Sequence, residues 1–426
     1  MHSWPAIDLP SVALNLPPLK IKCSSGKMTD VSSDWRMYVC GITPYDATHL
    51  GHAATYLNFD LINRYQKLRG ATVHFSENIT DIDDPLLERA NRDGQEWKTL
   101  ADDQIDLFAR DMQGLRVLPP EHFVPVTETI PQLISALEAL VAKGYTYKID
   151  GDLYFKITPF LDSLPLALED ALKIFSERGG DPDRIGKENP LDPLLWLANR
   201  PGEPGWPSSL GHGRPGWHIE CSVIALMTLV GEDYLSLHEK RAASLDLQGG
   251  GSDLIFPHHF MSAALGKALV GIDFASAYIH TGMVGLDGEK MSKSKGNLVF
   301  VSKLLAQGID PMALRYALIN SNFNEDRMWS KVILEDAEIK VANLRSTLSK
   351  VEVFTGSNFL NHLLLKYSHG LDTKGALEIL EKWALANLLS EELAIEELSK
   401  LDIGEISNAS PGEISRFIDS LFGLAL

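Results

Sequence analysis

The sequence predicts an α/β protein in which a doubly wound parallel sheet carries an inserted subdomain and is followed by a C-terminal helical domain. A β-rich run at Trp35–Cys40, a helix-spaced apolar pattern over residues 48–68 and a second β-rich run at Thr72–Phe75 form one parallel βαβ unit. The same alternation of helix and strand resumes after residue 216, and from about residue 304 the pattern is helical throughout.

Chain length and composition limit the possible classes of protein. With 426 residues, of which 45% are hydrophobic, the chain can bury a large core in two or three domains. The net charge of −18 provides no long-range attraction for nucleic acid. No apolar run of about 18 residues predicts a membrane span, and no N-terminal signal peptide is recognisable.

The cysteines are sparse and odd in number: Cys23, Cys40 and Cys221. Such a set does not form a disulfide framework and indicates a reducing compartment. We therefore expect a cytoplasmic, monomeric protein without a membrane or nucleic-acid partner.

Each further element is expected from its own local signals. Helical spacing predicts helices around 99–113 and 128–143, and Asp150-Gly151 at the centre of Tyr145–Ile157 predicts a hairpin. The segment 159–216 is rich in glycine, proline and charge, which is typical of an insertion over the sheet. Beyond it we expect a helix from Ile219, a strand at Leu245–Gln248, a glycine turn at Gly249–Gly251, a helix from near His258 and a strand at Tyr278–Met283.

These elements divide the chain into five segments. The proline-containing segment at the N-terminus is expected to be irregular, and the two halves of a nucleotide-binding catalytic domain flank the insertion. The expected boundaries are an N-terminal lead-in at 1–34, the first catalytic half at 35–115, a connective insertion at 116–215, the second half at 216–303 and a helical region at 304–426.

Two histidines stand where the first long helix begins, in His49-Leu50-Gly51-His52. A helix N-terminus after a parallel strand presents free N–H groups and the positive end of the helix dipole, and therefore attracts phosphate. Gly51 allows a nucleotide to approach the backbone, and both histidines can donate to phosphate oxygens. Two ordinary histidines on a helix are the simpler alternative, which this motif alone does not exclude.

Three lysines lie in the glycine-flanked loop Lys290-Met291-Ser292-Lys293-Ser294-Lys295-Gly296-Asn297. Such a loop can close over a triphosphate and neutralise the charge on departing pyrophosphate, with Lys290 and Lys293 as the candidates. A solvated basic turn is the alternative. The position of the loop after the histidine motif favours the first interpretation.

Together the two motifs resemble the HIGH and KMSKS signatures of class I aminoacyl-tRNA synthetases. This resemblance implies a doubly wound nucleotide-binding sheet. It also implies that the chain forms an aminoacyl adenylate from an amino acid and ATP, with Mg²⁺ on the phosphates.

Cys40, Cys221 and His258 are candidate metal ligands, although their spacing does not indicate a metal site, because no CxxC or HExxH pattern is present. On spacing alone, two buried cysteines and a helix-capping histidine are favoured. However, stretches around all three resemble the cysteinyl branch of class I enzymes: residues 38–46, 216–221 and 250–259. The resemblance implies that Cys40, Cys221 and His258 bind one Zn²⁺.

The cysteinyl-tRNA synthetases have a glutamate ligand four residues after that histidine, where this chain has Ser262. Three protein ligands leave the fourth tetrahedral position for the thiol of a cysteine substrate. Zinc deprotonates a bound thiol, whereas a serine hydroxyl is a poor and much less acidic ligand. The metal would then select cysteine without an editing domain.

The match is closer to one sub-branch, the mycothiol-pathway cysteine ligases, which join cysteine to the amine of glucosaminyl-inositol. The stretches that carry this likeness are residues 1–4, 40–52 and 78–90 and the segment Glu177, Arg178, Gly179, Gly180, Asp181 and Pro182. The last segment is the most diagnostic, and we expect it to fold over the hydroxyl-rich acceptor, although a charged glycine turn is the alternative. From Lys331 onward nine Lys/Arg and fifteen Asp/Glu give a net charge of −6, a poor surface for tRNA phosphates.

The resemblance also implies which residues bind the cysteinyl adenylate. Gly41 and Thr43 would meet the amine and carboxylate of cysteine, and Trp217 would wall its pocket unless it is a plain core residue. Asp253 would accept from an ammonium or ribose hydroxyl, and Val284 would meet adenine. The expected set is Cys40, Gly41, Ile42, Thr43, Thr55, Asn78, Ile79, Thr80, Trp217, Gly251, Ser252, Asp253 and Val284.

The expected substrates are L-cysteine, ATP and glucosaminyl-inositol. A cysteinyl-tRNA synthetase is the first alternative, and a non-catalytic paralogue that only binds cysteine or nucleotide is the second. Two departures from the family pattern lie near the site: residues 231–243 are about a dozen longer than expected, and Phe260 replaces a usual glutamate.

Overall fold

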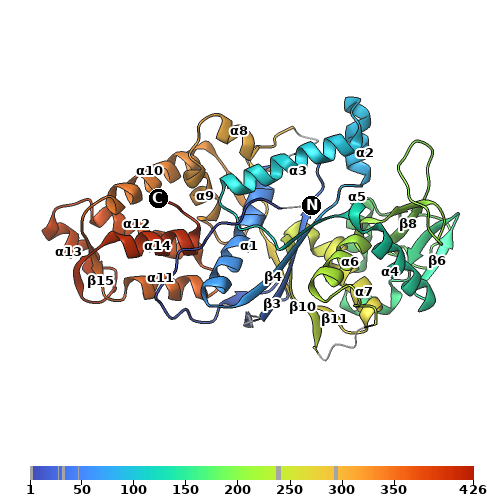
Figure 1. Ribbon diagram of the computed structural model, residues 1–426, viewed down its shortest axis with the longest axis horizontal. Coiled ribbons are helices and arrows are strands. Elements are labelled where there is room, and N and C mark those ends of the chain that lie inside the picture. The colour runs from blue at the N-terminus through green and yellow to red at the C-terminus, as the bar shows by residue number, and fades with distance from the viewer. Residues whose placement is uncertain (1–2, 27, 31–33, 47, 237–240, 292–295) are drawn as a thin grey trace.

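The computed structural model describes residues 3–26, 28–30, 34–46, 48–236, 241–291 and 296–426 (Figure 1). A central sheet separates two groups of elements. The C-terminal helices lie on one side of it, beyond α1, and the inserted subdomain lies on the other side with α6 and α7. In the described part of the chain, no helix is both long and apolar enough to cross a membrane.

The central sheet is parallel, with the strand order β11-β10-β3-β4-β5. The chain starts in the middle of the sheet, moves outward in one direction and returns to the other side of its first strand, so the order reverses between β3 and β10. This is the doubly wound sheet that the sequence predicts, with a ligand crevice expected at the reversal. The strands are β3 (Asp34–Ile42), β4 (Thr72–Ile79), β5 (His122–Pro125), β10 (Ala243–Gly251) and β11 (Asp273–Thr281).

Both faces of the sheet are buried, as expected for parallel strands covered by helices. Side chains of β3 alternate between two hydrophobic cores: Met37 and Val39 belong to one, Tyr38 and Cys40 to the other. The first core includes α1 and the C-terminal helices, and the second includes α6, α7 and the inserted subdomain. The helices before residue 271 are α1 (Leu50–Leu68), α2 (Asp84–Asp93), α3 (Trp97–Gly114), α4 (Ile130–Ala142), α5 (Leu168–Glu177), α6 (Trp217–Leu229) and α7 (Phe260–Val270).

The inserted subdomain has a sheet of its own, with the antiparallel order β6-β7-β8-β9. The predicted hairpin is confirmed, with Asp150 and Gly151 at positive φ between β6 and β7. The helix α5 and the strands β8 and β9 were not predicted within the charged segment 159–216. The strands are β6 (Thr146–Ile149), β7 (Asp152–Phe155), β8 (Leu194–Ala198) and β9 (Gly213–Pro215).

The C-terminal region is mainly helical, as predicted, but the expectation that it is helical throughout is wrong. The strand β14 pairs with β12 (Val284–Leu286). The strands β15 and β16 form an antiparallel pair that packs beside the helices. The helices are α8 (Val301–Ala306), α9 (Pro311–Ile319), α10 (Lys331–Leu348), α11 (Phe359–Ser368), α12 (Thr373–Ala386), α13 (Glu391–Ser399) and α14 (Pro411–Phe422). The short strands there are β14 (Arg327–Trp329), β15 (Val353–Gly356) and β16 (Ile406–Ala409).

A buried ionic cluster joins the C-terminal helices to α1. The Asp60 carboxylate accepts from Arg64 at 2.8 Å and from Arg315 of α9, and all three side chains are fully buried. Arg315 also donates to the carbonyls of Leu115 and Phe422, both at 2.6 Å. Because the charges are paired and further hydrogen-bonded, the cluster fixes how these helices meet.

Two further expectations need correction. Gly249–Gly251 do not form a turn: they continue β10 and pair with residues 279–281 of β11, and the helix begins at Phe260 after an irregular turn. The N-terminal lead-in contains a short antiparallel strand pair, in which residues 20–22 pair with residues 28–30. The remaining strands are β1 (Lys20–Lys22), β2 (Met28–Asp30), β12 (Val284–Leu286) and β13 (Glu289–Lys290).

Candidate active site

Two adjoining cavities open at the carboxyl ends of β3 and β10, where the strand order reverses. The smaller, of about 410 Å³, is here called the sheet cavity. The larger, of about 760 Å³, is called the insert cavity because the inserted subdomain lines most of it. Both are lined by Thr43, Tyr45, Trp217, Asp253 and Leu254, so they share a wall.

Cys40, Cys221 and His258 converge beside the sheet cavity, which Cys40 lines. Cys40 points to the face of β3 on which α6 packs, and α6 carries Cys221. The two Sγ atoms lie 3.8 Å apart, and His258 Nε2 lies 3.1 Å from Cys221 Sγ. All three ligand atoms are within 4.8 Å of one another, and all three residues are buried.

This donor set fits a tetrahedral zinc ion. Zinc–sulfur bonds of about 2.3 Å at tetrahedral angles separate two sulfurs by about 3.8 Å. Buried thiols without such an ion carry a large cost for ionisation, and burial raises the pKa of the Cys221 thiol well above its usual value. The observed spacing therefore matches the resident metal that the sequence resemblance implies.

Aromatic neighbours hold His258 in place. The Trp217 ring stacks on the His258 ring with 4.1 Å between centroids, and His218 Nδ1 lies 3.1 Å from His258 Nδ1. Burial lowers the pKa of His258 well below its usual value and that of His218 to about 3, so both rings are neutral near pH 7. A neutral imidazole whose second nitrogen is hydrogen-bonded is the form that binds metals.

A second histidine pair approaches Cys40 and was not predicted. His259 Nε2 lies 3.1 Å from Cys40 Sγ, and its Nδ1 lies 2.7 Å from His280 Nε2.

Ser262 does not replace the missing glutamate ligand, because its hydroxyl donates to the His258 carbonyl at 2.6 Å. Phe260 packs against Phe256 with 5.8 Å between ring centroids.

Gly41 is required by a close backbone approach. A Cβ there would lie 1.6 Å from the Asn78 carbonyl oxygen, and the Gly41 N–H donates to Asn78 Oδ1 at 2.8 Å. Asn78 Nδ2 donates to Thr80 Oγ1 at 3.1 Å, and Ile79 is fully buried in the core. Asn78, Ile79 and Thr80 therefore support the cavity wall from behind and do not line it.

His49 caps the helix that it begins. Its Nδ1 accepts from the N–H groups of Gly51 and His52 at 3.1 and 3.4 Å, and its ring stacks on that of His52 with 3.7 Å between centroids. Because Nδ1 is an acceptor, a neutral His49 carries its proton on Nε2, which is then a donor. The capping role was not predicted, and it orients the ring at the cavity.

The lysine loop is described only in part. Lys290 ends β13, whose partner β12 begins with Val284 of the cavity wall, but the Lys290 side chain and the whole of Lys293 lie outside the described residues. Met291, which follows Lys290, is buried and lines the sheet cavity. The roles of both lysines stay predictions.

Most of the remaining predicted residues line the sheet cavity, and Ser252 does not. Sequence reasoning missed further lining residues, some of them inside the quoted motifs, because how distant segments pack decides which side chains face the cavity. The predicted residues that line it are Cys40, Gly41, Ile42, Thr43, His49, His52, Thr55, Trp217, Gly251, Asp253 and Val284. The missed ones are Tyr45, Tyr56, Leu254, Gly282, Met283, Met291 and Leu298.

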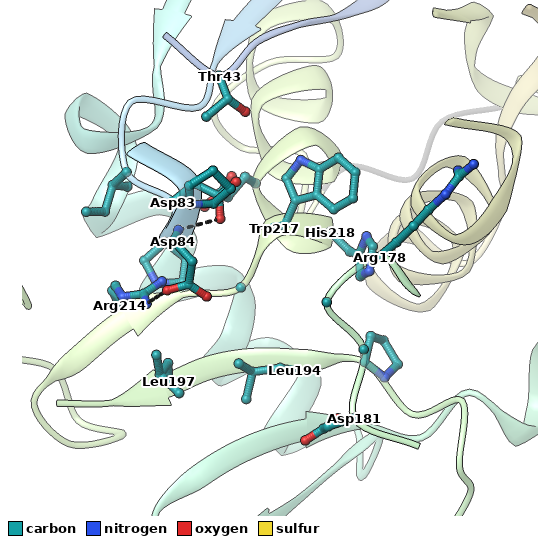
Figure 2. Close-up of a pocket in the computed structure, with 18 of the residues that line it drawn as sticks. Thr43, Asp83, Asp84, Arg178, Asp181, Leu194, Leu197, Arg214, Trp217 and His218 are labelled. Atoms are coloured by element: carbon teal, nitrogen blue, oxygen red, sulfur yellow. Dashed lines mark hydrogen bonds and ion pairs between the residues drawn. The ribbon is translucent and has the colours of Figure 1, made fainter. Parts of the chain in front are cut away.

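The predicted acceptor segment lines the insert cavity from Glu177 to Asp181, whereas Pro182 does not (Figure 2). Arg178 donates to the Phe256 carbonyl at 2.7 Å and so ties this segment to the chain just before His258. Asp181 accepts from Tyr154 at 2.5 Å and from Lys187 at 2.9 Å. The segment is therefore braced by ionic and hydrogen bonds.

A second ionic network holds the insert sheet beneath this segment. Arg184 binds the buried Asp152 at 2.6 Å and the Tyr154 hydroxyl at 2.7 Å. Across the cavity, Arg214 of β9 contacts Asp84 and lies 3.1 Å from Glu203. Asp84 lies in the stretch 78–90 that carries the sub-branch likeness, but the sequence assigned none of these residues a role.

Comparison with known proteins gives this arrangement a family. Residues 28–339 match the family described as tRNA synthetases class I (C) catalytic domain. The chain belongs to this class I synthetase family. Its resemblance to that family, stated above from the two short motifs and the three candidate ligands, is thereby confirmed.

Within the class I synthetase family, similar curated proteins are ligases. A protein of Streptomyces griseus named L-cysteine:1D-myo-inositol 2-amino-2-deoxy-alpha-D-glucopyranoside ligase is 45% identical over all of both chains. A protein of Rhodococcus erythropolis with the same name is 44% identical, again over all of both chains. The recognised sub-branch is therefore confirmed over the full length.

Solved class I synthetases share the fold. A Mycobacterium tuberculosis methionyl-tRNA synthetase bound by methionyl-adenylate superposes with a TM-score of 0.61, covering 91% of this chain and 92% of that one. The two sequences are only 18% identical, so this likeness concerns the fold alone. It includes the parallel sheet and the helices after it.

Proposed function

We propose that this class I enzyme activates cysteine with ATP and transfers the cysteinyl group to the amine of glucosaminyl-inositol, releasing diphosphate and AMP. The observation that carries the proposal is the cluster of Cys40, Cys221 and His258 beside the sheet cavity, which Cys40 lines and which shares a wall with the larger insert cavity. The names of the full-length relatives support this acceptor.

The cluster accounts for the choice of cysteine. A zinc ion held by these residues, when bound, supplies a soft, electropositive site that a cysteine thiolate fills and a serine hydroxyl does not. Trp217 and Thr43 border this site, and Asp253 offers a carboxylate to the substrate ammonium. Cysteine is then oriented with its carboxylate toward the N-terminus of α1.

ATP would meet the start of α1. Its phosphates face His49, Gly51 and His52, where histidine donors and the helix dipole stabilise negative charge. The cysteine carboxylate attacks the α-phosphorus, the bond to the bridging oxygen breaks, and diphosphate leaves with Mg²⁺. Lys290 and Lys293 are proposed to neutralise its charge, and Val284 to contact adenine.

The acceptor would occupy the insert cavity. Its volume of about 760 Å³ is ample for a two-ring sugar, and the lining carries many charged side chains that can bond hydroxyl groups. The acceptor amine attacks the adenylate carbonyl across the shared wall, an amide bond forms, and AMP leaves. Confinement of both reactants supplies much of the acceleration.

We propose further that the enzyme acts as a cytoplasmic monomer without nucleic acid. The acidity of the chain, at −18 overall, supports the absence of a tRNA partner. A cysteinyl-tRNA synthetase would share the activation half of the reaction, and the two functions differ only in the acceptor.

The deciding experiment offers both acceptors to the purified protein. Cysteine, ATP and Mg²⁺ are incubated with either glucosaminyl-inositol or tRNA-Cys, and the products are identified by mass spectrometry. We expect the cysteinyl amide of glucosaminyl-inositol and no cysteinyl-tRNA. The converse result would establish the tRNA synthetase, and failure of cysteine-dependent pyrophosphate–ATP exchange would indicate a non-catalytic paralogue.

A further inference from the structure

The insert cavity has an acidic side next to the shared wall. Asp83, Asp84 and Glu88 come from the start of α2, and Glu220 comes from α6. Figure 2 shows Asp83 grouped with Thr43 and Trp217 on one side of the cavity, while Leu194, Leu197 and Asp181 lie on the other. Thr43 and Trp217 are residues of the shared wall, so this acidic group lies near the site of transfer.

Glu220 has an unsatisfied carboxyl. It is 1% exposed, lines the insert cavity, and its Oε2 has no hydrogen-bond partner in the described part of the chain. A buried polar atom without a partner is costly, and native proteins rarely retain one without a purpose. A ligand that donates N–H groups would satisfy it.

Asp83 is also only partly engaged. One carboxyl oxygen, Oδ1, caps α2 by accepting from the Asp84 N–H at 2.8 Å. Arg214, whose charge lowers the pKa of Asp83, forms its ion pairs with Asp84 and Glu203. Burial raises the pKa of Asp83 to about 6, with Asp84 and Glu88 adding to the rise and Arg214 opposing it.

We infer that Asp83 and Glu220 form the subsite for the acceptor's ammonium group and that Asp83 takes its proton. The inference rests on the proposed function and adds the catalytic base that it lacks. The ammonium gives one proton to the Asp83 carboxylate, and the resulting amine uses its lone pair to form the C–N bond. The bond from the carbonyl carbon to the phosphate oxygen breaks, and its electron pair leaves with AMP. The second proton that the attacking nitrogen must lose passes to a phosphate oxygen of the departing AMP.

The location agrees with the geometry of activation. The thiol of the cysteinyl adenylate is expected at Cys40 and Cys221, so its carbonyl carbon would lie near Thr43 and Trp217 at the shared wall. The charge of Asp83 also reaches Tyr45, another residue of that wall. Burial raises the pKa of Tyr45 to about 12, and the Asp83 charge is the second cause of this rise. An amine held by Asp83 is therefore directed at the carbonyl.

The decisive variant is Asp83→Asn. Asparagine caps helices as well as aspartate does, so α2 keeps its first turn while the charge and the proton acceptor are lost. We expect cysteine-dependent pyrophosphate–ATP exchange within about twofold of the unaltered enzyme. The kcat/KM for glucosaminyl-inositol should fall about 100-fold, the usual effect of removing a general base. In Glu220→Gln, the acceptor KM should rise about tenfold.

A matched control and an analogue separate charge from structure. Asp93→Asn alters a carboxylate at the other end of α2, outside both cavities, and should change neither half-reaction. Glucosyl-inositol, with a hydroxyl in place of the amine, should inhibit the unaltered enzyme and Asp83→Asn equally. Weaker inhibition of the variant would assign Asp83 a structural role and overturn the inference.

The outcomes distinguish this inference from the proposed function. If the unaltered enzyme forms no product with glucosaminyl-inositol, the proposed function fails, and the inference fails with it. If the unaltered enzyme forms the product and Asp83→Asn forms it equally fast, only the role of Asp83 is refuted. An unchanged acceptor KM in Glu220→Gln refutes the part given to Glu220.

Discussion

The two cavities of this enzyme share a wall but are built differently. The sheet cavity lies at the ends of parallel strands, beside the cluster of Cys40, Cys221 and His258, in which burial raises the pKa of Cys221 and lowers that of His258. The insert cavity is bordered by carboxylates and guanidinium groups joined in ion pairs, as in Arg184 with Asp152 and Arg214 with Asp84.

This difference separates two chemical tasks. The cluster beside the sheet cavity offers soft donors, so a bound metal would decide which amino acid enters. The insert cavity offers many polar groups to a hydroxyl-rich molecule and gains its shape from ion pairs that brace its loops. Changes in one cavity should therefore leave the other half-reaction intact, and the shared wall should be the exception.

The largest effect is expected from Cys221→Ser, which removes one of the three candidate metal ligands beside the sheet cavity. Activation should fall at least about 10³-fold, because a serine hydroxyl does not replace a thiolate on zinc. Pyrophosphate–ATP exchange and metal content measure it, and zinc per chain should fall well below one. The matched variant Cys23→Ser lies outside both cavities and should retain both zinc and exchange. Retention of exchange by Cys221→Ser would contradict the metal site.

Trp217→Ala tests the shared wall. The ring stacks on His258 and lines both cavities, so we expect a loss of about 100-fold that appears in exchange and again in transfer from isolated adenylate. Trp217→Phe keeps an aromatic ring on His258 and should lose only about threefold. If only activation or only transfer were slowed, Trp217 would contribute to one cavity and not to both.

Glu77→Gln tests whether a carboxyl buried in the central sheet stays protonated in the folded protein. Glu77 of β4 is buried, its Oε2 has no partner within the described residues, and burial raises its pKa to about 8. Since the folded pKa exceeds the unfolded value, this group favours folding most below about pH 4.5, and its contribution is lost progressively up to about pH 8.

The non-titrating Gln variant should therefore gain stability relative to the unaltered protein as pH rises from about 4.5 to 8. The difference in free energy of unfolding should reach about 5 kcal/mol, the linkage value for a pKa raised from 4.5 to about 8. Urea unfolding at several pH values measures it. A difference that does not change with pH would show that Glu77 is ionised in the folded protein.

The smallest effect is expected from Arg184→Met in the insert cavity. Loss of its bonds to Asp152 and Tyr154 weakens the support that the insert sheet gives to the acceptor segment. The kcat/KM for the acceptor should therefore fall about tenfold, while pyrophosphate–ATP exchange stays unchanged. Arg92→Met removes an exposed ion pair with Asp93 and serves as the control. A comparable loss of pyrophosphate–ATP exchange in Arg184→Met would show that the insert cavity also contributes to activation, contrary to this prediction.

Residues in compact motifs were predictable, and residues that act through packing were not. His49, Gly51 and His52 stand together in the chain and line the sheet cavity together. Asn78, in contrast, accepts from the Gly41 N–H and does not line the sheet cavity, so its predicted contact with the adenylate stays a prediction. Asp83 and Glu220 of the insert cavity stand within stretches that carry the family resemblance, but the resemblance assigned them no role, and only the folded chain brings them to one cavity.

By itself the sequence determined the βαβ periodicity, the class I motifs and the candidate ligands Cys40, Cys221 and His258. These features depend on local spacing and on short motifs, which a linear chain records. Only the tertiary structure decided that the glycines after Leu247 extend a strand, that Arg178 reaches the segment before His258, and that two cavities share one wall. Such contacts join residues far apart in the chain, so they arise from packing that no local pattern specifies.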